Sequence, residues 1–456
     1  MGKGIWIGSC ATVFFVLSTC GCGAFAQPSI PPISATGDQK ARAVLPNYVN
    51  TPDSTFAWHL TQQFKSPQGT FLALSFQSQT WRSIPWKHQL FVFFPAGNSS
   101  QTGFPSLQME FDLKKAHTAL RQLAQTTGVP CAILCDIPNQ PLFEGKEEEE
   151  LLNYTFEQFL ATKDTTWPLL LPMVKATVRA MDVLQAASQG HHLPLLYQFV
   201  VAGHSKRGHT AWLTAAVDRR VAGLIAQGFN TLHAARQIPH YLATYGALDQ
   251  SALAAKQVIE QINSPTGQQL LAIVDAYTYR QQLTMPKLVI LGTNDDYTPV
   301  DALNLYWSGL GGSKSILSLP NTGHVGANND PRLYPTAYAF IERVAHGKPM
   351  PTVESTMHPT PQGSRLMIST TDSAVSARVW IATSPTLDFR DAQWEMKTVP
   401  LMSSTVAPPN KLNRRSYQVD LENRSTGNQA VIAEVEFYYV TRRFWLSTIP
   451  YVLRSH

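Results

Sequence analysis

The sequence predicts an α/β fold built on a doubly wound, mostly parallel sheet with a helical lid insertion, plus a small C-terminal β-sandwich. Between residues 71 and 345, apolar runs alternate with amphipathic helical segments, which is typical of a parallel sheet covered by helices on both faces. Residues 231–283 are mostly helical in pattern and interrupt this alternation, as an inserted lid would. Beyond residue 350, short alternating segments separated by turn residues predict the strands of a sandwich.

Each element is placed by its own local pattern. Apolar or β-branched runs predict strands at 71–79, 90–94, 131–135, 195–202, 221–226, 287–291 and 315–319. Helical periodicity predicts helices at 113–127, 147–160, 173–187, 206–217, 303–310 and from 331 onward. Gly128 is expected to end the first of these helices, because glycine adopts the left-handed conformation of a helix end. In the C-terminal part, strands are expected at 365–370, 375–381, 415–421 and 429–438.

The N-terminus has the features of a signal peptide over residues 1–26. Lys3 supplies a positive charge, residues 6–17 are largely apolar, and Ala24-Phe25-Ala26 places small residues at the cleavage positions. The apolar stretch is short for a membrane anchor, which needs roughly 20 residues. A retained anchor and, through Cys20, a lipoprotein are the alternatives. We therefore expect an exported protein, periplasmic or extracellular, without a stable transmembrane segment.

The remaining domain boundaries follow from changes in composition. Residues 27–50 are rich in Pro, Ala and Ser and predict a loose N-terminal segment. An α/β domain is expected over 51–350, with its lid at 231–283, and the β-sandwich over 351–456. Since single cores stop growing at roughly 250–300 residues, a chain of 456 residues is expected to hold more than one domain.

Composition and charge exclude several classes of function. The chain has 44% hydrophobic and 15% charged residues, and a net charge of only +5 from 36 basic and 31 acidic residues. No basic run is interleaved with aromatic residues, so no nucleic-acid partner is expected. The sequence shows no metal-ligand cluster and no glycine-rich phosphate loop, so no metal and no cofactor is predicted.

Two cysteines, Cys131 and Cys135, lie beyond the signal peptide within one apolar strand. Four residues of strand span roughly 13 Å, which is too far for a disulfide. The sequence therefore predicts two buried free thiols. A redox or metal role for this C-x-x-x-C spacing is the alternative, but no further His or Cys lies nearby in the sequence.

A nucleophile motif follows the predicted strand 195–202 and opens the next helix. It reads Gly203-His204-Ser205-Lys206-Arg207-Gly208, a G-x-S-x-x-G pattern in which the second glycine comes one position later than in the common G-x-S-x-G form. A strand-to-helix turn of this kind presents a serine hydroxyl at the sheet edge. Ser205 is thus the candidate nucleophile, and the backbone N–H of Lys206 is the candidate oxyanion donor at the start of the helix.

The candidate acid and base lie downstream, in the order that such folds use. Asp295 follows the strand 287–291 and is the predicted acid, with the adjacent Asp296 as the alternative. His324 follows the strand 315–319 and is the predicted base. Taken alone, each residue could be an ordinary turn, capping or surface residue. Together they predict a Ser-Asp-His triad, because the carboxyl ends of parallel strands meet at one edge of a sheet.

Four other histidines, and the two basic residues that follow Ser205, are not assigned to the triad. His204, His209, His240 and His358 lack a matching position and are expected to be structural or solvated. Lys206 and Arg207 are expected either to line an anionic substrate site or to be solvated charges at a helix start.

Six blocks of the chain resemble the PhoPQ-activated pathogenicity-related proteins, a family similar to α/β-hydrolases. The blocks are residues 136–142, 167–175, 180–182, 205–208, 292–296 and 320–324, and the similarity extends to Asp388-Phe389-Arg390. The resemblance implies the α/β-hydrolase fold and an elbow of the Ser-Lys-Arg-Gly form. It also implies export. It says little about the substrate.

The sequence thus predicts a secreted serine hydrolase that cleaves an ester or amide bond of a small-molecule or peptide substrate. The lid would shape the acyl pocket, with Tyr241, Tyr245, Tyr277 and Tyr279 as candidate lining residues. The second oxyanion donor is open, since residues 106–112 contain no glycine pair and Gly97 is the nearest candidate. The alternative is a non-catalytic or weakly catalytic secreted virulence or signalling factor. In either case the β-sandwich could bind a protein partner.

Overall fold

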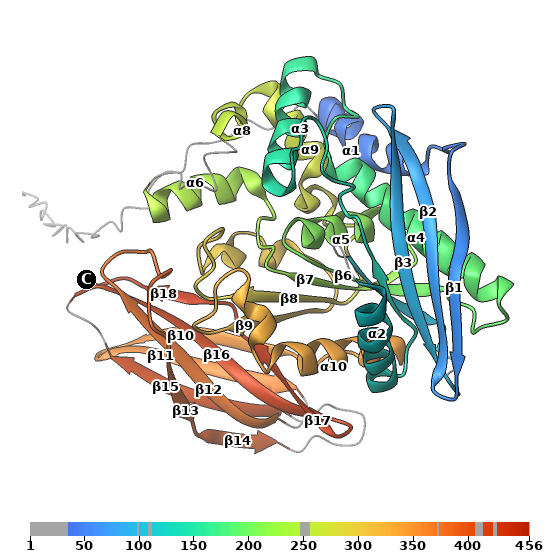
Figure 1. The fold of residues 1–456 in the computed structure, drawn as a ribbon. Coiled ribbons are helices and arrows are strands. Elements are labelled where there is room, and N and C mark those ends of the chain that lie inside the picture. The colour runs from blue at the N-terminus through green and yellow to red at the C-terminus, as the bar shows by residue number, and fades with distance from the viewer. Residues whose placement is uncertain are drawn as a thin grey trace, which may run out of the picture. The chain divides into compact units, whose positions relative to one another are not determined.

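The structure is a computed structural model that describes residues 35–97, 100–107, 112–246, 256–371, 374–405, 414–422 and 426–455. The predicted signal peptide lies outside these residues. A central sheet runs through the described part, with strand order β1-β2-β3-β5-β4-β6-β7-β8-β9 (Figure 1). The strands β1 to β3 pair antiparallel, and β5, β4, β6, β7, β8 and β9 run parallel to one another. The bounds are β1 Ala57–Ser66, β2 Gly69–Trp81, β3 Ile84–Pro95, β4 Thr102–Leu107, β5 Cys131–Leu134, β6 Gln198–His204, β7 Val221–Gln227, β8 Lys287–Gly292 and β9 Lys314–Leu319.

Helices cover both faces of this sheet. Their bounds are α1 Ala35–Asn50, α2 Leu113–Thr127, α3 Glu148–Thr162, α4 Leu170–Gly190, α5 Lys206–Val217, α6 Ala234–Tyr245, α8 Lys256–Gln261, α9 Pro265–Val274 and α10 Leu333–Ala345. Buried side chains of α1, α4 and α5 belong to one hydrophobic core, and those of α2 and α10 to a second. The strand β2 feeds both cores, since Leu72 and Leu74 enter the first, and Phe71 and Ala73 the second. The predicted doubly wound α/β architecture is confirmed.

Helix α2 illustrates how local sequence sets these bounds. The Asp112 side chain accepts hydrogen bonds from the N–H groups of Lys114 and Lys115 and so caps the first turn. Gly128 ends the helix with φ 66°, in the left-handed conformation predicted for it. The two cysteines of the following strand are buried and free, as predicted.

Two local expectations were wrong, and one strand was not predicted. The segment 27–50 is not loose throughout, because 35–50 form α1, whose Ala41, Leu45 and Val49 are buried at helical spacing. The strand β4 was missed, because Pro105 stands inside it and proline is unusual in a central strand. The helix expected at 303–310 is two short 3₁₀ turns, Ala302–Leu305 and Trp307–Gly309.

The C-terminal strands form two sheets, as the prediction of a sandwich requires. One sheet has the order β10-β11-β15-β14. The other, β17-β16-β12-β13, continues the central sheet, because Ser447 of β17 pairs with Ile316 of β9. Residues 33–456 accordingly form one compact unit. The bounds are β10 Val353–Thr360, β11 Gly363–Thr371, β12 Ala374–Ser384, β13 Glu395–Val399, β14 Leu401–Thr405, β15 Arg414–Glu422, β16 Asn428–Tyr439, β17 Arg442–Ser447 and β18 Tyr451–Leu453.

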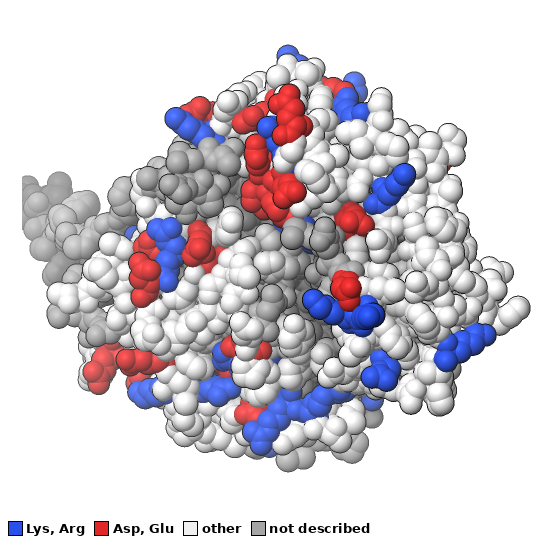
Figure 2. Space-filling view, in the orientation of Figure 1, with Lys and Arg blue, Asp and Glu red and all other residues white. Residues whose placement is uncertain are grey.

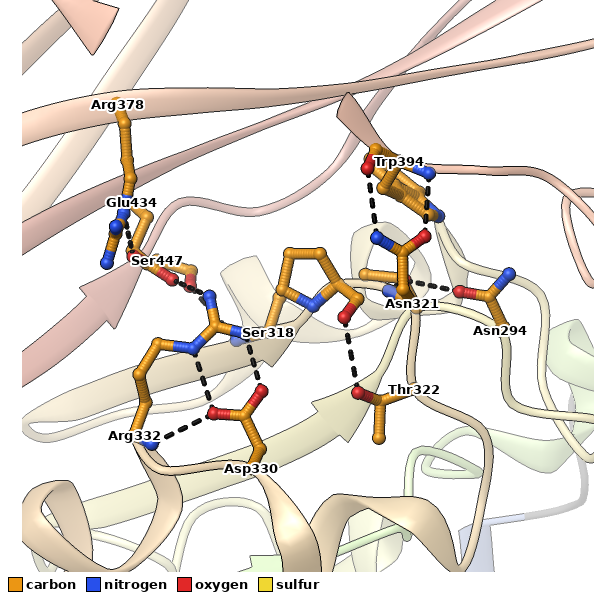
Figure 3. A network of polar contacts seen from close by, with 12 residues as sticks. Asn294, Ser318, Asn321, Thr322, Asp330, Arg332, Arg378, Trp394, Glu434 and Ser447 are labelled. Atoms are coloured by element: carbon orange, nitrogen blue, oxygen red, sulfur yellow. Dashed lines mark hydrogen bonds and ion pairs between the residues drawn. The ribbon is translucent and has the colours of Figure 1, made fainter. Parts of the chain in front are cut away.

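Polar contacts reinforce this continuous sheet (Figure 3). The N–H of Ser318 donates to the hydroxyl of Ser447 at 3.0 Å. Arg332, just before α10, pairs with the fully buried carboxylate of Glu434 in β16, to which Arg378 of β12 also donates. The two guanidinium groups offset part of what this carboxylate loses on leaving water, although burial still raises its pKa. In the described part of the chain, no helix has both the length and the apolar character needed to cross a membrane.

Candidate active site

Ser205 occupies the turn between β6 and α5 in a strained backbone conformation. Its φ of 54° and ψ of −128° are rare for any residue other than glycine. The N–H of Ser205 donates to the carbonyl of Gln227, the last residue of β7, at 2.9 Å. The half-buried serine therefore lies at the carboxyl edge of the parallel strands and at the N-terminus of α5. This geometry is that of a nucleophile elbow.

Two glycines allow the chain to fold back on itself at this elbow. A Cβ added to Gly203 would lie 2.2 Å from the carbonyl oxygen of Arg207, so no side chain fits there. A Cβ on Gly208 would lie 3.1 Å from both the carbonyl oxygen of Gly203 and the Cβ of Phe229. The close approach thus joins Gly203 to residues 207–208, which explains why the second glycine stands at 208.

Asp295 and His324 are joined by a hydrogen bond. Oδ2 of Asp295, after β8, lies 2.8 Å from Nδ1 of His324, after β9, and the two side chains are only 3% and 10% exposed. The other carboxylate oxygen accepts the N–H of Tyr297 at 2.8 Å, which fixes the carboxylate. Asp296 is exposed, so the geometry favours Asp295 over it as the orienting acid. Such a pair sets the tautomer that leaves Nε2 of the imidazole available as a base.

His324 reaches the edge of the sheet that carries Ser205, but the structure records no hydrogen bond between these two described side chains. Cε1 of His324 would lie 3.2 Å from a Cβ placed on Gly228, the residue after the Gln227 that binds Ser205. In unliganded enzymes catalytic hydrogen bonds are often long and shorten only when substrate binds. The structure therefore joins the candidate acid and base, and it places His324 close to Gly228, which follows the residue that Ser205 binds.

Two aromatic rings flank the imidazole of His324. The neighbouring His204 donates from Nε2 to the backbone carbonyl of His324 at 3.0 Å, and the two rings lie 4.8 Å apart. Burial lowers the pKa of His204, which favours the neutral ring that this bond uses. The ring of Tyr297 also lies close, with its centre 4.3 Å from that of His324. His204 thus has a structural role, holding the loop of the base to the elbow.

The other three histidines also make structural contacts. His209 bonds through Nε2 to the carbonyl of Val274, and burial lowers its pKa to about 4. His240 pairs with Asp301 at 2.7 Å, and His358 contacts the hydroxyl of Thr356. Their predicted structural role is consistent with these contacts.

Lys206 and Arg207 neither line an anion site nor extend into solvent, so both alternatives given for them were wrong. Their side chains are buried and bind the start of α3: Lys206 pairs with Glu148 and Glu149, and Arg207 with Glu148. Burial acts to raise the pKa of Glu148, but hydrogen bonds from Arg207 and Lys206 outweigh it and hold that pKa at about 2. Acidic side chains gather on the face that carries α3 (Figure 2). The acidic run 147–150 at the start of α3 supplies the carboxylates of this network.

Of the two expected oxyanion donors, only the first lies within the described residues. The N–H of Lys206 belongs to the first turn of α5, where backbone N–H groups have no acceptor within the helix. The segment between β4 and α2, where a second donor was expected, includes 108–111, which lie outside the described residues. Gly97 is not that donor, because it follows β3, which runs antiparallel to β5 and ends at the opposite edge of the sheet.

An apolar pocket of about 290 Å³ lies beneath the helical insertion. Phe229 and Tyr297 line it, and the ring of Tyr297 also contacts that of His324. The pocket extends between α3, α6, α8 and α9, where its lining residues include Leu152, Phe156, Ile238, Tyr241, Val258, Ile262, Leu270 and Val274. Asp275 is one of the polar residues that line the pocket. Its carboxylate accepts hydrogen bonds from the N–H groups of His233 and Ala234 at the start of α6. Sequence patterns did not reveal this wall, because it joins residues from separate helices.

Only one of the four predicted lid tyrosines lines this pocket. Tyr241 does so, and Tyr245 packs edge-on against it at 4.8 Å. Tyr277 stacks on His233, and the buried Tyr279 donates to the carbonyl of Ile273, so both serve packing. Aromatic residues on an inserted helical segment are thus divided between pocket and core.

Comparison with known proteins finds similarity both in sequence and in structure. The chain is 26% identical over 429 residues to autocrine proliferation repressor protein A of Dictyostelium discoideum, which covers 87% of this chain and 86% of that protein. Among solved structures, it is similar to acetyl xylan esterase 1 from Thermoanaerobacterium sp. JW/SL YS485, with 14% identity, a TM-score of 0.49, and coverage of 69% of this chain and 95% of the esterase. The acetyl xylan esterase from Paenibacillus sp. R4 gives 13% identity, a TM-score of 0.49, and coverage of 69% and 96%.

The family assignment rests on a match to a family model rather than to a single relative. The model of the PhoPQ-activated pathogenicity-related proteins matches residues 45–390, which is well over half of the chain and includes the elbow, the acid and the base. The α/β-hydrolase fold follows from the doubly wound sheet, the strained elbow at Ser205 and the helical insertion before β8. The chain therefore belongs to the PhoPQ-activated pathogenicity-related protein family.

Proposed function

We propose that this protein is a serine hydrolase that cleaves an ester or amide bond through an acyl-enzyme, with Ser205, His324 and Asp295 as its triad. The observation that supports this most is the buried hydrogen bond between Asp295 and His324 beside the strained Ser205. Strain of this kind costs about 1–3 kcal/mol and is found where function requires it. An ordinary turn would not need it.

The mechanism follows from the positions of these groups. The Ser205 hydroxyl attacks the scissile carbonyl while Nε2 of His324 takes its proton, and Asp295 stabilises the imidazolium. The negative oxygen of the tetrahedral intermediate lies at the N-terminus of α5, where the Lys206 N–H donates to it. The intermediate collapses when His324 returns the proton to the leaving alcohol or amine. Water then attacks the acyl-enzyme by the same route and releases the acid.

The pocket narrows the substrate class. Its walls are mostly aliphatic and aromatic, so the substrate carries an apolar group next to the scissile carbonyl. A volume of about 290 Å³ accommodates a medium acyl chain or an aromatic side chain and excludes a large polar group. We infer that the substrate is a small ester or a peptide, met outside the cytoplasm after removal of the predicted signal peptide.

A paired substrate screen tests this proposal. Wild type and Ser205→Ala are assayed with p-nitrophenyl esters from acetyl to octanoyl and with apolar aminoacyl p-nitroanilides. We expect turnover of one class by wild type, and none above background by a folded Ser205→Ala. Equal rates for both proteins would contradict a serine mechanism.

A second candidate is a secreted virulence or signalling factor with little or no catalysis. It is favoured by the similarity to a relative named for repressing proliferation, over 87% of this chain. In that case the surface and not the triad acts. Ser205→Ala would then retain any effect of the purified protein on target cells, whereas a catalytic mechanism requires its loss.

A further inference from the structure

The segment that links β12 to β13, residues 385–394, lies against both loops of the candidate triad. Asn294 precedes Asp295 directly, and its side-chain amide donates to the carbonyls of Arg390 and Ala392 at 2.8 Å each, and of Phe389 at 3.4 Å. Three acceptors therefore surround one amide group. The position of the acid loop is thus set by a segment almost a hundred residues further along the chain.

The loop of the base is held by the same segment. Asn321, three residues before His324, donates through its side-chain amide to the carbonyl of Trp394 at 2.9 Å and accepts the N–H of Trp394 at 2.7 Å (Figure 3). Asn321 has a φ of 60°, a conformation that asparagine tolerates better than most residues. This two-way contact fixes both the distance and the orientation of the loop.

The segment is itself rigidly anchored. Phe389 and Trp394 are both only 2% exposed and pack with Ala382, Ala430 and Ile432 in a hydrophobic cluster of the sandwich. Close packing of this kind restricts the positions that the backbone carbonyls can take. The carbonyls that Asn294 and Asn321 bind are therefore fixed points supplied by the C-terminal strands.

Direct contacts also join the two loops to each other. The Thr293 hydroxyl donates to Oδ1 of Asn294 at 2.8 Å and accepts the N–H of Asn321 at 3.1 Å. The N–H of Asn294 donates to the carbonyl of Thr322 at 3.0 Å. Both asparagines, the threonine and the segment 385–394 thus form one connected network around the acid and the base.

The same segment reaches the lid. The guanidinium of Arg390 lies 3.9 Å from the ring centre of Tyr245 in α6, and Asp388 holds that guanidinium through paired hydrogen bonds. The Tyr245 hydroxyl in turn donates to the backbone carbonyl of Asp295 at 3.5 Å. Asp388-Phe389-Arg390, the block to which the family resemblance extends, therefore joins the acid loop to the lid.

We propose that residues 385–394 are a positioning element, which fixes Asp295 against His324 through Asn294 and Asn321. The side-chain amides of both asparagines bind backbone groups of residues 385–394 and not the substrate, so we assign both as positioning residues. The proposed serine hydrolase activity is needed only for the effect on turnover, whereas the effect on the acid–base hydrogen bond is independent of catalysis. In this proposal the C-terminal sandwich sets the geometry of the candidate acid and base.

The test observes the Asp295–His324 bond directly, in the full chain labelled with ¹⁵N-histidine. A proton held between Nδ1 and a carboxylate exchanges slowly with water and gives a downfield NMR resonance, which is assigned by its absence in His324→Gln. The test variants are Asn294→Ala and Asn321→Gly, the second chosen because glycine suits the φ of 60°. The matched control is Asn304→Ala. This change removes an amide that also joins the α/β part to the C-terminal strands, but it donates to the Pro450 carbonyl at 2.9 Å rather than to residues 385–394.

We expect a protected resonance in wild type and Asn304→Ala, and its broadening or loss in both test variants at unchanged fold. Turnover should fall by about 100-fold in kcat, with little change in KM, because misplacement by about 1 Å costs this much. An unchanged resonance in either folded test variant, or no protected resonance in wild type, overturns the proposal. Should Asn294→Ala fail to fold, Asn321→Gly decides. If wild type shows a protected resonance that is lost in the two asparagine variants, but shows no turnover, the result supports the positioning element and contradicts the proposed hydrolase activity.

Discussion

Nδ1 of His324 and Oδ2 of Asp295 lie 2.8 Å apart, although 29 positions of chain separate the two residues. The second oxygen of Asp295 is occupied by the N–H of Tyr297, so the carboxylate has a single orientation toward the imidazole. This arrangement turns Nε2 of His324 away from the acid, which is the requirement for a general base. The contact links the ends of β8 and β9 and defines the candidate site more firmly than any single motif.

Replacing Asp295 by Asn should lower kcat by about 10³–10⁴-fold, because an amide no longer selects the correct imidazole tautomer. Asp296→Asn serves as the control, since Asp296 is adjacent but exposed. It should retain activity within about twofold, as exposed substitutions of this kind usually have small effects. Steady-state kinetics on the ester or amide found by the screen checks both. Equal losses in the two variants would contradict the assignment of the acid.

Ser205→Gly should be more stable than Ser205→Ala by about 1 kcal/mol in the free energy of unfolding. Both lack the hydroxyl, but only glycine adopts a φ of 54° and ψ of −128° without strain. Urea unfolding of the two proteins gives the difference. An alanine variant as stable as the glycine variant would show that the elbow is not strained.

Glu148→Gln should destabilise the protein by about 1–2 kcal/mol near neutral pH, because it leaves the buried side chain of Arg207 without its ionic partner and Lys206 with Glu149 alone, while partial exposure of Glu148 screens the loss. The pKa of Glu148 is about 2 in the folded protein and about 4.5 ordinarily. A depressed carboxyl pKa stabilises the fold above the ordinary value, and this contribution is lost as the pH falls from about 4.5 toward 2. Unfolding curves measured across this range should therefore converge for wild type and variant.

The control for that experiment is Glu150→Gln. Glu150 is 66% exposed and pairs only at the surface with Lys146, so its replacement should change stability by less than about 1 kcal/mol. If the Glu148 and Glu150 variants lose equal stability, the buried network does not support the elbow.

Ile238→Trp should narrow the range of acyl groups that the enzyme accepts. Ile238 lines the pocket from α6, and a larger ring there fills space that a long acyl chain would occupy. We expect kcat/KM for octanoyl esters to fall by about 10-fold or more relative to acetyl esters, since each lost methylene contact costs about 0.8 kcal/mol. Leu242→Trp, on the same helix but outside the pocket wall, should leave the ratio unchanged. An unchanged ratio in both would place the acyl group elsewhere.

Much of the fold could be predicted because its strands are buried on both faces. The runs that became β5 to β9 are nearly continuous in apolar residues, and each precedes a helix or a site loop. The exception is β4, where Gly103 and Pro105 disguise a central strand. The helix α1 was hidden by Pro46 and by a composition typical of a loose segment, although its buried positions recur every fourth residue.

The site was predictable in outline, because Ser205, Asp295 and His324 each follow a strand in a fixed order. Sequence could not choose between Asp295 and Asp296, since the loop's direction alone decides which carboxylate is buried. Nor could it foresee that Lys206 and Arg207 would be neutralised by Glu148, or that Asn294 would bind the Arg390 carbonyl 96 positions away. Contacts of this kind depend on how distant loops pack, and no local pattern encodes them.

The most direct test of the triad is the covalent reaction of Ser205 with a fluorophosphonate, followed by mass spectrometry of the labelled peptide. A serine with its base in reach reacts stoichiometrically, whereas other surface hydroxyls do not. We predict one adduct, located on Ser205, that forms at least about 100-fold more slowly in His324→Gln and is absent in Ser205→Ala. Folded wild-type protein that carries no adduct at Ser205, or that reacts as fast without His324, would contradict the proposed triad.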